Sequence, residues 1–231
     1  MQPPAPPARL SVIVPALNEA ARLPRLLGDL AALRTLGHEV IVVDGGSTDR
    51  TREIACSACD RVLASAPGRA PQMNAGALEA QGEVLWFLHA DTRVPPEAAH
   101  AILRSLRGPK CWGRCRVRLS GRAPIYRLIA ALMNLRSCLT GIATGDQGLY
   151  VTRAAFVAAG GFPAIPLMED IALSRALKRA CGRPVCLPVQ LETSSRRWEE
   201  HGVLRTVLLM WALRLAYWRG ADPADLARRY R

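Results

Sequence analysis

The chain has 231 residues, half of them hydrophobic and 5% aromatic, which fits one globular domain with a sizeable core and excludes a disordered or fibrous protein. The formal net charge is +12, and only Lys110 and Lys178 are lysines, so arginine carries nearly all of the positive charge. A diphosphate substrate, an acidic membrane surface and nucleic acid each suit such a charge, and charge alone does not choose among them.

The first segment, residues 1–9, is rich in proline and lacks the apolar stretch of a secretory signal, so we predict a disordered lead-in. Seven cysteines, an odd number, favour free thiols in a reducing cytoplasm. The pairs Cys56/Cys59 and Cys111/Cys115 have zinc-like spacing, but the two pairs are far apart in sequence and nothing else supports a zinc site.

Strands and helices alternate over the first hundred residues. Short apolar runs predict buried strands at residues 10–14, 40–43, 62–63 and 84–88. Leucine spacing, capping residues and starting prolines predict helices at residues 21–33, 51–58, 71–80 and 95–106. This alternation predicts an α/β fold, with a mostly parallel open sheet flanked by helices.

The second half is less regular. It predicts strands at residues 111–119, 147–151 and 185–187, and helices at residues 124–139, from 154, at 169–180 and at 199–218. The last helix has an apolar part of about 16 residues, which is short of the roughly 20 that span a bilayer. Arg205 and Arg214 fall on opposite sides of it, so we expect packing on the domain or a partner subunit, with contact to a membrane surface as the alternative.

Polar residues follow three of the predicted strands. Pro15 and Glu19 follow the first strand, Asp44 ends the second, and His89 and Asp91 follow the strand at 84–88. Ligands of open α/β sheets bind at the carboxyl ends of the strands, so these side chains are expected around one crevice. Clustered carboxylates repel one another unless a cation or donor groups lie between them.

Each of these groups has a chemical interpretation and a structural alternative. Asp91 suits a divalent ion that bridges to a diphosphate, and His89 is a second candidate ligand or a hydrogen-bonded neighbour. Asp44 suits the N–H of a nucleobase, or a helix cap. Arg69 suits phosphate oxygens, or a solvated loop.

Three later segments carry further candidates. Asp146 and Gln147 lie in a polar turn between glycines. Glu169 and Asp170 open a predicted helix, where acids are favoured by the helix dipole and where a catalytic base is the functional alternative. The third segment, a diphosphate-binding candidate or a surface loop, consists of Arg196, Arg197 and Trp198.

Taken together and in this order, four motifs resemble the family 2 glycosyltransferases, whose fold is called GT-A. The motifs are Val12-Ile-Val-Pro-Ala-Leu-Asn-Glu19, Val42-Val-Asp-Gly-Gly-Ser-Thr-Asp49, Phe87-Leu-His-Ala-Asp91 and Met168-Glu-Asp170. The resemblance spans about residues 10–200, and the variants around Asp146 and Asp170 look like a compact bacterial branch without transmembrane segments.

The resemblance implies a role for each matching position. The nucleotide pocket would hold Pro15, Asn18, Glu19, Asp44 and Arg69. Asp91 would be the metal-binding acid of the D-x-D motif, and Asp170 the catalytic base. The donor sugar or the acceptor would lie near Asp146, Gln147 and Glu169, and the diphosphate near Arg196, Arg197 and Trp198.

Two positions depart from the family pattern. His89 stands where the first acid of D-x-D is expected, which affects the ribose contact and the metal geometry. Ser194 stands where processive members have the glutamine of Q-x-x-R-W, so processive polymer synthesis is not expected.

The resulting hypothesis is a catalytic domain at residues 10–198, followed by a helical tail at 199–231 that packs on it. We expect an inverting transfer of sugar from a nucleoside diphosphate sugar, with UDP preferred over GDP, to an acceptor hydroxyl, with Mg²⁺ or Mn²⁺ as cofactor. The acceptor is unnamed, and a lipid-linked one suits the apolar tail. We expect a cytoplasmic protein, with peripheral contact to the inner face of the membrane as an option, and no nucleic-acid partner.

Two alternatives remain at this point. A nucleotidyltransferase has a similar sheet and similar metal chemistry, but it usually needs a glycine-rich basic loop where this chain has residues 15–19. A protein that binds a nucleotide sugar without turning it over is the second alternative, because His89 replaces an acid.

Overall fold

The computed structural model describes residues 9–230, and the expected lead-in therefore lies almost entirely outside the described residues. The strands are β1 (Leu10–Ala16), β2 (Glu39–Asp44), β3 (Arg61–Ala64), β4 (Val84–Phe87), β5 (Trp112–Leu119), β6 (Tyr150–Thr152) and β7 (Val185–Thr193). The α-helices are α1 (Leu23–Thr35), α2 (Thr51–Ala58), α3 (Arg69–Glu79), α4 (Ala98–Ser105), α5 (Pro124–Thr140), α6 (Arg153–Ala158), α7 (Glu169–Cys181), α8 (Arg196–His201), α9 (Val203–Trp218) and α10 (Pro223–Tyr230).

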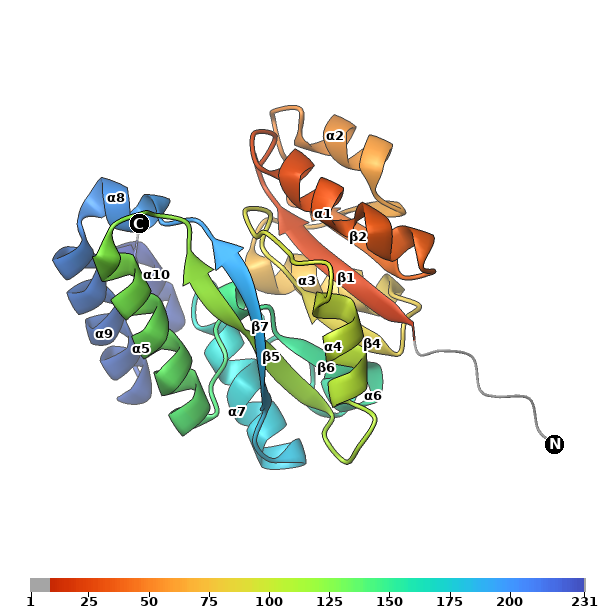
Figure 1. The fold of residues 1–231 in the computed structure, drawn as a ribbon. Helices are drawn as coiled ribbons and strands as arrows, with labels where there is room; N and C mark the ends of the chain where they lie inside the picture. Colours follow the sequence, from red (N-terminus) through yellow and green to blue (C-terminus); the bar gives the residue numbers. More distant parts are fainter. Residues whose placement is uncertain (1–8, 231) are drawn as a thin grey trace.

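The strands form a seven-stranded sheet in the order β3-β2-β1-β4-β6-β5-β7 (Figure 1). Strand β6 pairs antiparallel with both of its neighbours, and the other pairs are parallel. The expected α/β class with a mostly parallel sheet is thus confirmed. Because β1, β2 and β4 are parallel neighbours, their carboxyl ends meet at one edge, which is where an open sheet binds ligands.

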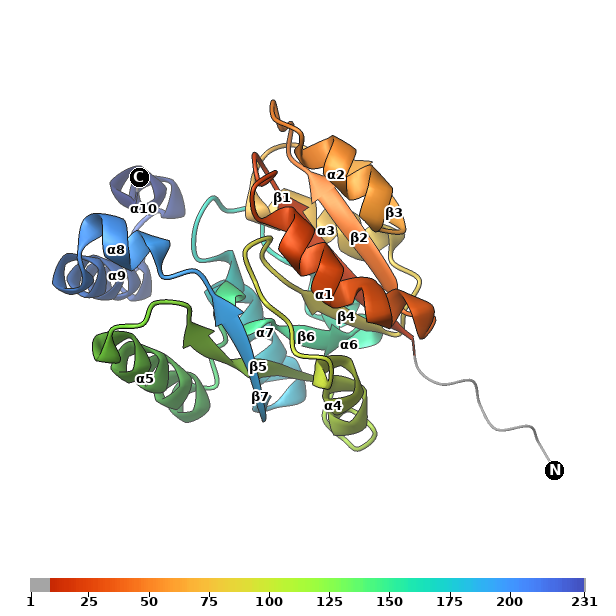
Figure 2. The ribbon, with the colours of Figure 1, turned by 45° about the horizontal axis from the view of Figure 1, so that its top comes forward.

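Helices cover both faces of the sheet. Val12 and Val14 of β1 pack in a core with α1, α2 and α4, whereas Ile13 packs in a second core with α3, α6 and α7. This alternation follows from the two-residue period of a strand. Because helices cover both faces, β1 is apolar at every position except Ser11. Helices α5, α9 and α10 gather on the side of the molecule away from α2 (Figures 1 and 2), and Leu213 and Leu226 form a smaller core there.

Several element boundaries differ from the sequence-based prediction, and three of these differences have an identifiable cause. The expected helix 199–218 is divided into α8 and α9 at Gly202, whose φ of 79° lies in the region that glycine tolerates. The expected strand at 147–151 begins only at Tyr150, because a capping box between Thr144 and Gln147 closes a 3₁₀ turn first. Strand β7 extends to Thr193, since its alternate residues continue to be buried.

Helix α3 lies directly on β1 and β2 at Gly76. A Cβ at this position would lie 2.5 Å from Ile13 Cγ2 and 3.1 Å from Val43 Cγ2. We therefore expect Gly76→Ala to lower the free energy of unfolding by about 1–2 kcal/mol, because overpacking outweighs the gain in helix propensity. Urea denaturation measures this effect. Gly28→Ala in α1 is the matched control, because no atom lies within 4 Å there, and it should be neutral or stabilising.

Among the helices of residues 9–230, none combines the length and the apolar character that crossing a bilayer requires. The seven cysteines are free thiols.

Candidate active site

A polar pocket of about 390 Å³ opens at the carboxyl ends of β1 and β4. Its walls come from five parts of the chain: the loop after β1, the start of α3, the loop after β4, the turn that contains Asp146, and the segments from β7 to the C-terminal helices. The sequence-predicted residues that line it are Pro15, Glu19, Arg69, His89, Asp91, Asp146, Arg196, Arg197 and Trp198. The topology therefore brings together most of the residues that the sequence analysis assigned to nucleotide, metal and diphosphate.

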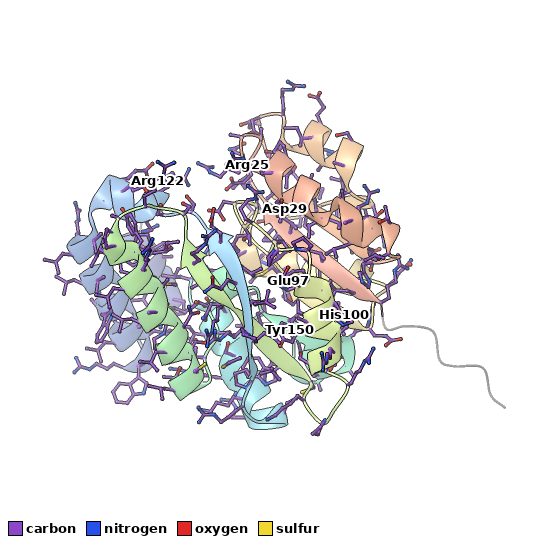
Figure 3. All side chains as sticks on the ribbon, viewed as in Figure 1. Arg25, Asp29, Glu97, His100, Arg122 and Tyr150 are labelled. Atoms are coloured by element: carbon purple, nitrogen blue, oxygen red, sulfur yellow. The ribbon has the colours of Figure 1, made fainter. Side chains whose placement is uncertain are left out.

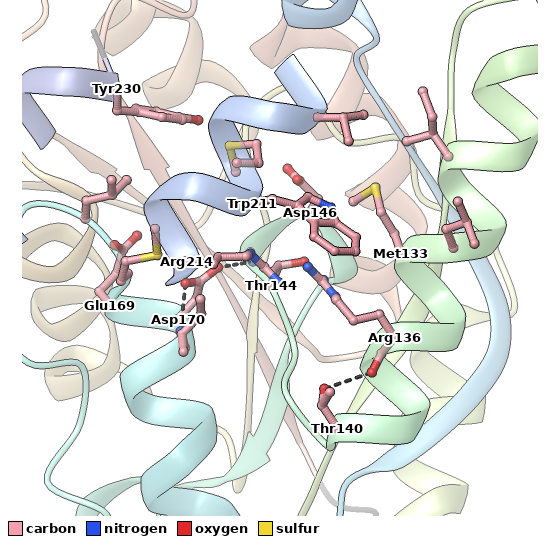
Figure 4. A pocket seen from close by; sticks show the side chains of 18 of the residues that line it. Met133, Arg136, Thr140, Thr144, Asp146, Glu169, Asp170, Trp211, Arg214 and Tyr230 are labelled. Atoms are coloured by element: carbon pink, nitrogen blue, oxygen red, sulfur yellow. Dashed lines mark hydrogen bonds between the residues drawn. The ribbon is translucent and has the colours of Figure 1, made fainter. Parts of the chain in front are cut away.

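An apolar pocket of about 500 Å³ adjoins the polar pocket, mainly between α5 and α9 (Figure 4). Glu169 and Asp170 line this second pocket and not the first. The two pockets meet at shared wall residues, which are Arg69, His89, Asp146, Trp198, Met210 and Tyr230. The site is thus a cleft with a polar compartment and an apolar compartment, joined beside His89.

Asp44 and Asn18 were expected in the nucleotide pocket, but neither lines it. Asp44 is 5% exposed, and its Oδ1 accepts a hydrogen bond of 2.5 Å from Ser47 Oγ. Ser47 Oγ in turn accepts the backbone N–H of Asn18, whose Oδ1 accepts the N–H of Thr48 at 2.9 Å. The side chains of Asp44 and Asn18 thus make hydrogen bonds to the loop after β2. These bonds tie the loops after β1 and β2 together.

The loop after β4 carries His89 and Asp91, and both side chains are partly buried. This loop is anchored two residues beyond Asp91, where Arg93 makes a two-pronged ion pair of 2.7 and 2.9 Å with Asp29 of α1 (Figure 3 labels Asp29). His89 Nδ1 lies 3.3 Å from Asp146 Oδ1. Burial raises the pKa of the Asp146 carboxyl, but His89, together with the arginines Arg69 and Arg136, more than offsets this, so the pKa is lowered and the carboxylate stays charged.

The donor groups fit a divalent cation that is held jointly with a diphosphate. Within residues 9–230 no cluster of three or more His, Cys, Asp or Glu side chains forms a closed metal cage. Mg²⁺ and related ions in nucleotide sites take one or two carboxylates and complete their shell with phosphate oxygens and water. Asp91, with His89 and Asp146 near it in the same pocket, offers such an open set of ligands.

Asp170 lies in the first turn of α7, beside the turn that begins at Gly145. Its Oδ2 accepts the Gly145 N–H at 2.9 Å, and its Oδ1 accepts the Ile171 N–H at 2.7 Å. Burial raises the pKa of Asp170 even though these two hydrogen bonds lower it. Burial and the neighbouring charge of Asp170 also raise the pKa of Glu169. A fixed carboxylate whose pKa is raised has the properties of a general base.

Arg69 sits between the two compartments and is exposed to the cleft. Burial within the cleft opposes its charge, but the carboxylates of Glu169, Asp146 and Asp170 and the nearby Tyr230 outweigh this, so the pKa of Arg69 is raised. A guanidinium at the junction is well placed for an anionic substrate group.

Gln147 was expected near a sugar, but its side chain is fully buried and lines neither pocket. Its Oε1 closes a capping box with Thr144, and its Nε2 lies 3.4 Å from Asn134 Oδ1. Gln147 therefore shapes the turn that presents Asp146 and the Gly145 N–H, which is a positioning role.

The sequence analysis missed residues at the C-terminal end. Tyr230 of α10 lines both pockets, and the guanidinium carbon of Arg197 lies 3.6 Å from its ring centroid. Arg197 Nη2 also donates to the Tyr230 carbonyl at 2.7 Å. Gln72 was missed too, and it lines the polar pocket while donating to two backbone carbonyls at the ends of β1 and β2. No motif flags these residues, because their role depends on tertiary packing.

Solved structures share this architecture. Glucosyl-3-phosphoglycerate synthase from Mycobacterium tuberculosis, in complex with Mn²⁺, UDP and glucosyl-3-phosphoglycerate, aligns with a TM-score of 0.62 at 23% identity over 80% of this chain and 71% of that one. TarS residues 1–349 from S. aureus, in complex with UDP-GlcNAc, align with a TM-score of 0.64 at 21% identity over 80% of this chain and 58% of that one. The fold is that of the GT-A glycosyltransferases.

Sequence similarity defines the family. Residues 11–155, more than half of the chain, match the family described as Glycosyl transferase family 2, and the protein belongs to it. Undecaprenyl-phosphate 4-deoxy-4-formamido-L-arabinose transferase from Pseudomonas paraeruginosa is 34% identical over 60% of this chain and 44% of its own length. Validoxylamine A glucosyltransferase from Streptomyces hygroscopicus subsp. jinggangensis is 36% identical over 43% of this chain and 26% of its own length. The chain thus spans less than half the length of these curated relatives.

Proposed function

We propose that the protein transfers a sugar from a nucleoside diphosphate sugar, UDP in preference to GDP, to an acceptor hydroxyl with inversion at the anomeric carbon. The observation that carries the proposal is the two-compartment cleft. Asp91 lines the polar compartment and Asp170 the adjoining apolar one. A donor and an acceptor bound in these compartments would meet beside His89, between a diphosphate site and a base. Structures of the same fold contain UDP with Mn²⁺ or Mg²⁺, which supports the choice of nucleotide and cation.

In this mechanism Asp170 removes the proton of the acceptor hydroxyl as the oxygen attacks the anomeric carbon. The hydrogen bonds from the Gly145 and Ile171 N–H groups hold the carboxylate in place for that transfer. Arg196 and Arg197 line the polar compartment and stabilise the diphosphate as it leaves from the opposite face. Asp91, with His89 as a second candidate ligand, would hold a divalent cation, which would supply positive charge near the leaving diphosphate.

For the acceptor, the proposal names a chemical class and no individual molecule. One relative is named for transfer to undecaprenyl phosphate, a lipid carrier, and the apolar compartment is compatible with a lipid-linked acceptor here. Such an acceptor would bring the protein to the inner face of the membrane as a peripheral protein. Residues 199–230, with α9 and α10 packed around Leu213 and Leu226, form part of this compartment in the proposal.

A panel of nucleotide sugars tests the proposed reaction. Each donor is incubated with the protein and Mn²⁺ or Mg²⁺, and release of the nucleoside diphosphate is measured. We expect turnover of a UDP-sugar that depends on the cation, and none of UTP or CTP. Release from no nucleotide sugar, or consumption of a nucleoside triphosphate instead, would contradict the proposal.

The pH dependence of transfer should report Asp170. Only the deprotonated carboxylate can accept a proton, so kcat/KM should fall about tenfold per pH unit on the acidic side. Burial raises the pKa of Asp170, so the midpoint of this fall should lie above the usual value of about 3.9 for aspartate. Steady-state rates between acidic and neutral pH measure the midpoint, and UDP affinity measured in parallel should not follow the same curve. A rate that stays constant down to the usual aspartate value would contradict the base assignment.

A further inference from the structure

The apolar pocket contains a positive charge without a partner. Arg136 projects from α5 into it (Figure 4), and its Nε and Nη2 atoms are buried with no hydrogen-bond partner among residues 9–230. By contrast, the buried Arg114 donates from Nη2 to the Asn134 carbonyl at 2.8 Å, and only its Nε lacks a hydrogen-bond partner among residues 9–230. The Nε and Nη2 atoms form one edge of the guanidinium, and this edge binds two oxygens of a phosphate or carboxylate.

The protein itself compensates this charge only in part. Burial lowers the pKa of Arg136, in opposition to the charges of Asp170 and Asp146, and no ion pair to either residue forms within the described chain. A buried charge without a partner is unfavourable, and an oxyanion from a ligand would relieve the cost. Arg136 therefore has the features of a binding residue for an anionic group close to Asp170.

The open side of the pocket continues into two exposed apolar faces. The face on α5 consists of Leu128, Leu132, Leu135 and Leu139, each more than half exposed. The face on α9 consists of Leu204, Leu208, Trp211, Leu215 and Trp218, and Trp211 is 74% exposed. Within each helix these residues are three, four or seven positions apart, so they share one face. We call the two faces together the α5/α9 face.

The chemistry of this face favours a lipid bilayer over a second copy of the chain. Tryptophans such as Trp211 and Trp218 are enriched where a protein meets a membrane surface. Exposed arginines lie next to this face in the sequence. They are Arg127 on α5, Arg205 on α9 and Arg219 directly after α9. With a net charge of +12, the chain complements an anionic surface and would be repelled by a copy of itself.

We propose that the acceptor is an acidic membrane lipid with a free headgroup hydroxyl, whose phosphate binds Arg136 and whose chains lie along the α5/α9 face at the bilayer surface. This inference rests on the proposed function and names its acceptor class. The headgroup oxygen forms a bond to the anomeric carbon, the bond from that carbon to the diphosphate breaks, and the hydroxyl proton passes to Asp170.

Vesicle binding tests the face without any enzymatic readout. Sedimentation with phosphatidylglycerol vesicles should retain the wild-type protein, and phosphatidylcholine vesicles should not. The variant Leu208→Glu/Leu215→Glu/Trp218→Glu lies outside the pocket wall and should reduce binding by about tenfold or more. The matched variant Leu36→Glu/Leu78→Glu/Val157→Glu adds the same charge at exposed positions elsewhere and should reduce it much less. Equal losses in the two variants, or a dimer in solution that the first variant dissociates, would overturn the docking surface.

Arg136→Met tests the phosphate site. Transfer to phosphatidylglycerol vesicles should fall by about 30-fold or more, because the buried oxyanion loses its partner. The affinity for UDP with Mn²⁺ should stay within about twofold, and the melting temperature should not fall, because the variant removes an uncompensated charge. Arg52→Met, an exposed change on α2, on the side of the molecule away from the α5/α9 face, should leave lipid transfer unaltered. A lower melting temperature with unchanged lipid transfer would show that Arg136 is structural.

The choice of acceptor separates this inference from the proposed function. Transfer to phosphatidylglycerol but not to glycerol 3-phosphate supports a lipid acceptor, and equal use of both removes the role of the face. Transfer only to neutral soluble hydroxyls overturns the inference and leaves the proposed function intact. A protein that binds the vesicles but turns over no nucleotide sugar contradicts the proposed function and the acceptor with it.

Discussion

Asp170→Asn is expected to reduce sugar transfer by about 10²–10⁴-fold, the usual contribution of a positioned general base. Asparagine keeps the size of the side chain and can still accept the Gly145 N–H, but it cannot take up the acceptor proton. The affinity for UDP with Mn²⁺ should change little, because Asp170 does not line the polar compartment. Single-turnover kinetics together with nucleotide titration separate these two quantities.

The melting temperature is a control for this variant. Because burial raises the pKa of Asp170, ionising this carboxyl costs more in the folded protein than in the unfolded chain, and the neutral asparagine should be at least as stable as the wild type. Glu169→Gln is the matched substitution at the adjacent carboxylate and should retain more activity. If Asp170→Asn turns over like the wild type, or if Glu169→Gln alone abolishes transfer, the base has been assigned to the wrong residue.

Asp91→Asn is expected to lower kcat/KM by about 10²–10³-fold, which corresponds to several kcal/mol of lost stabilisation of the leaving diphosphate. In contrast to Asp170→Asn, this change should also weaken the binding of UDP that depends on Mn²⁺. Titration calorimetry with and without the cation measures the difference.

Glu97→Gln removes a negative charge at an exposed position at the start of α4 and should leave the cation dependence unchanged. His89→Ala tests the second candidate ligand and should lower cation affinity less than Asp91→Asn. Full retention of cation-dependent UDP binding in Asp91→Asn would remove Asp91 from the metal site.

The fold was predictable from the sequence because the buried strands are continuous apolar runs. Val40 to Val43 and Val84 to Phe87 are such runs, and each is followed by a helix with its own start signals. The prediction failed where one residue interrupts a pattern. Gly202 stands within a stretch that otherwise favours helix, and its positive φ separates α8 from α9.

The candidate site was predictable in part, for a related reason. Asp91 and Glu19 follow strands whose ends must meet at one edge of a parallel sheet, so topology places them together. Asp44 also ends such a strand, but its carboxylate accepts a hydrogen bond from Ser47. The sequence does not show whether this carboxylate faces Ser47 or the pocket.

The apolar compartment could not be predicted from sequence patterns. Arg136 and Tyr230 belong to helices whose sequences indicate only amphipathic packing. They line the pocket because of the tertiary packing of α5, α9 and α10, which no local pattern encodes. The leucines of α9 suggested burial on the domain. Most of them instead remain exposed, because only Leu213 and its neighbours contact α10 and the loop before α7.

The most direct test of the account is a crystal structure with UDP and Mn²⁺ bound, in which anomalous scattering locates the cation. We expect the diphosphate in the polar compartment, the cation between Asp91 and the phosphate oxygens, and Asp170 free of the cation and facing the space left for the sugar. A nucleotide bound elsewhere, or a cation on Asp170, would contradict the division of roles between the two compartments.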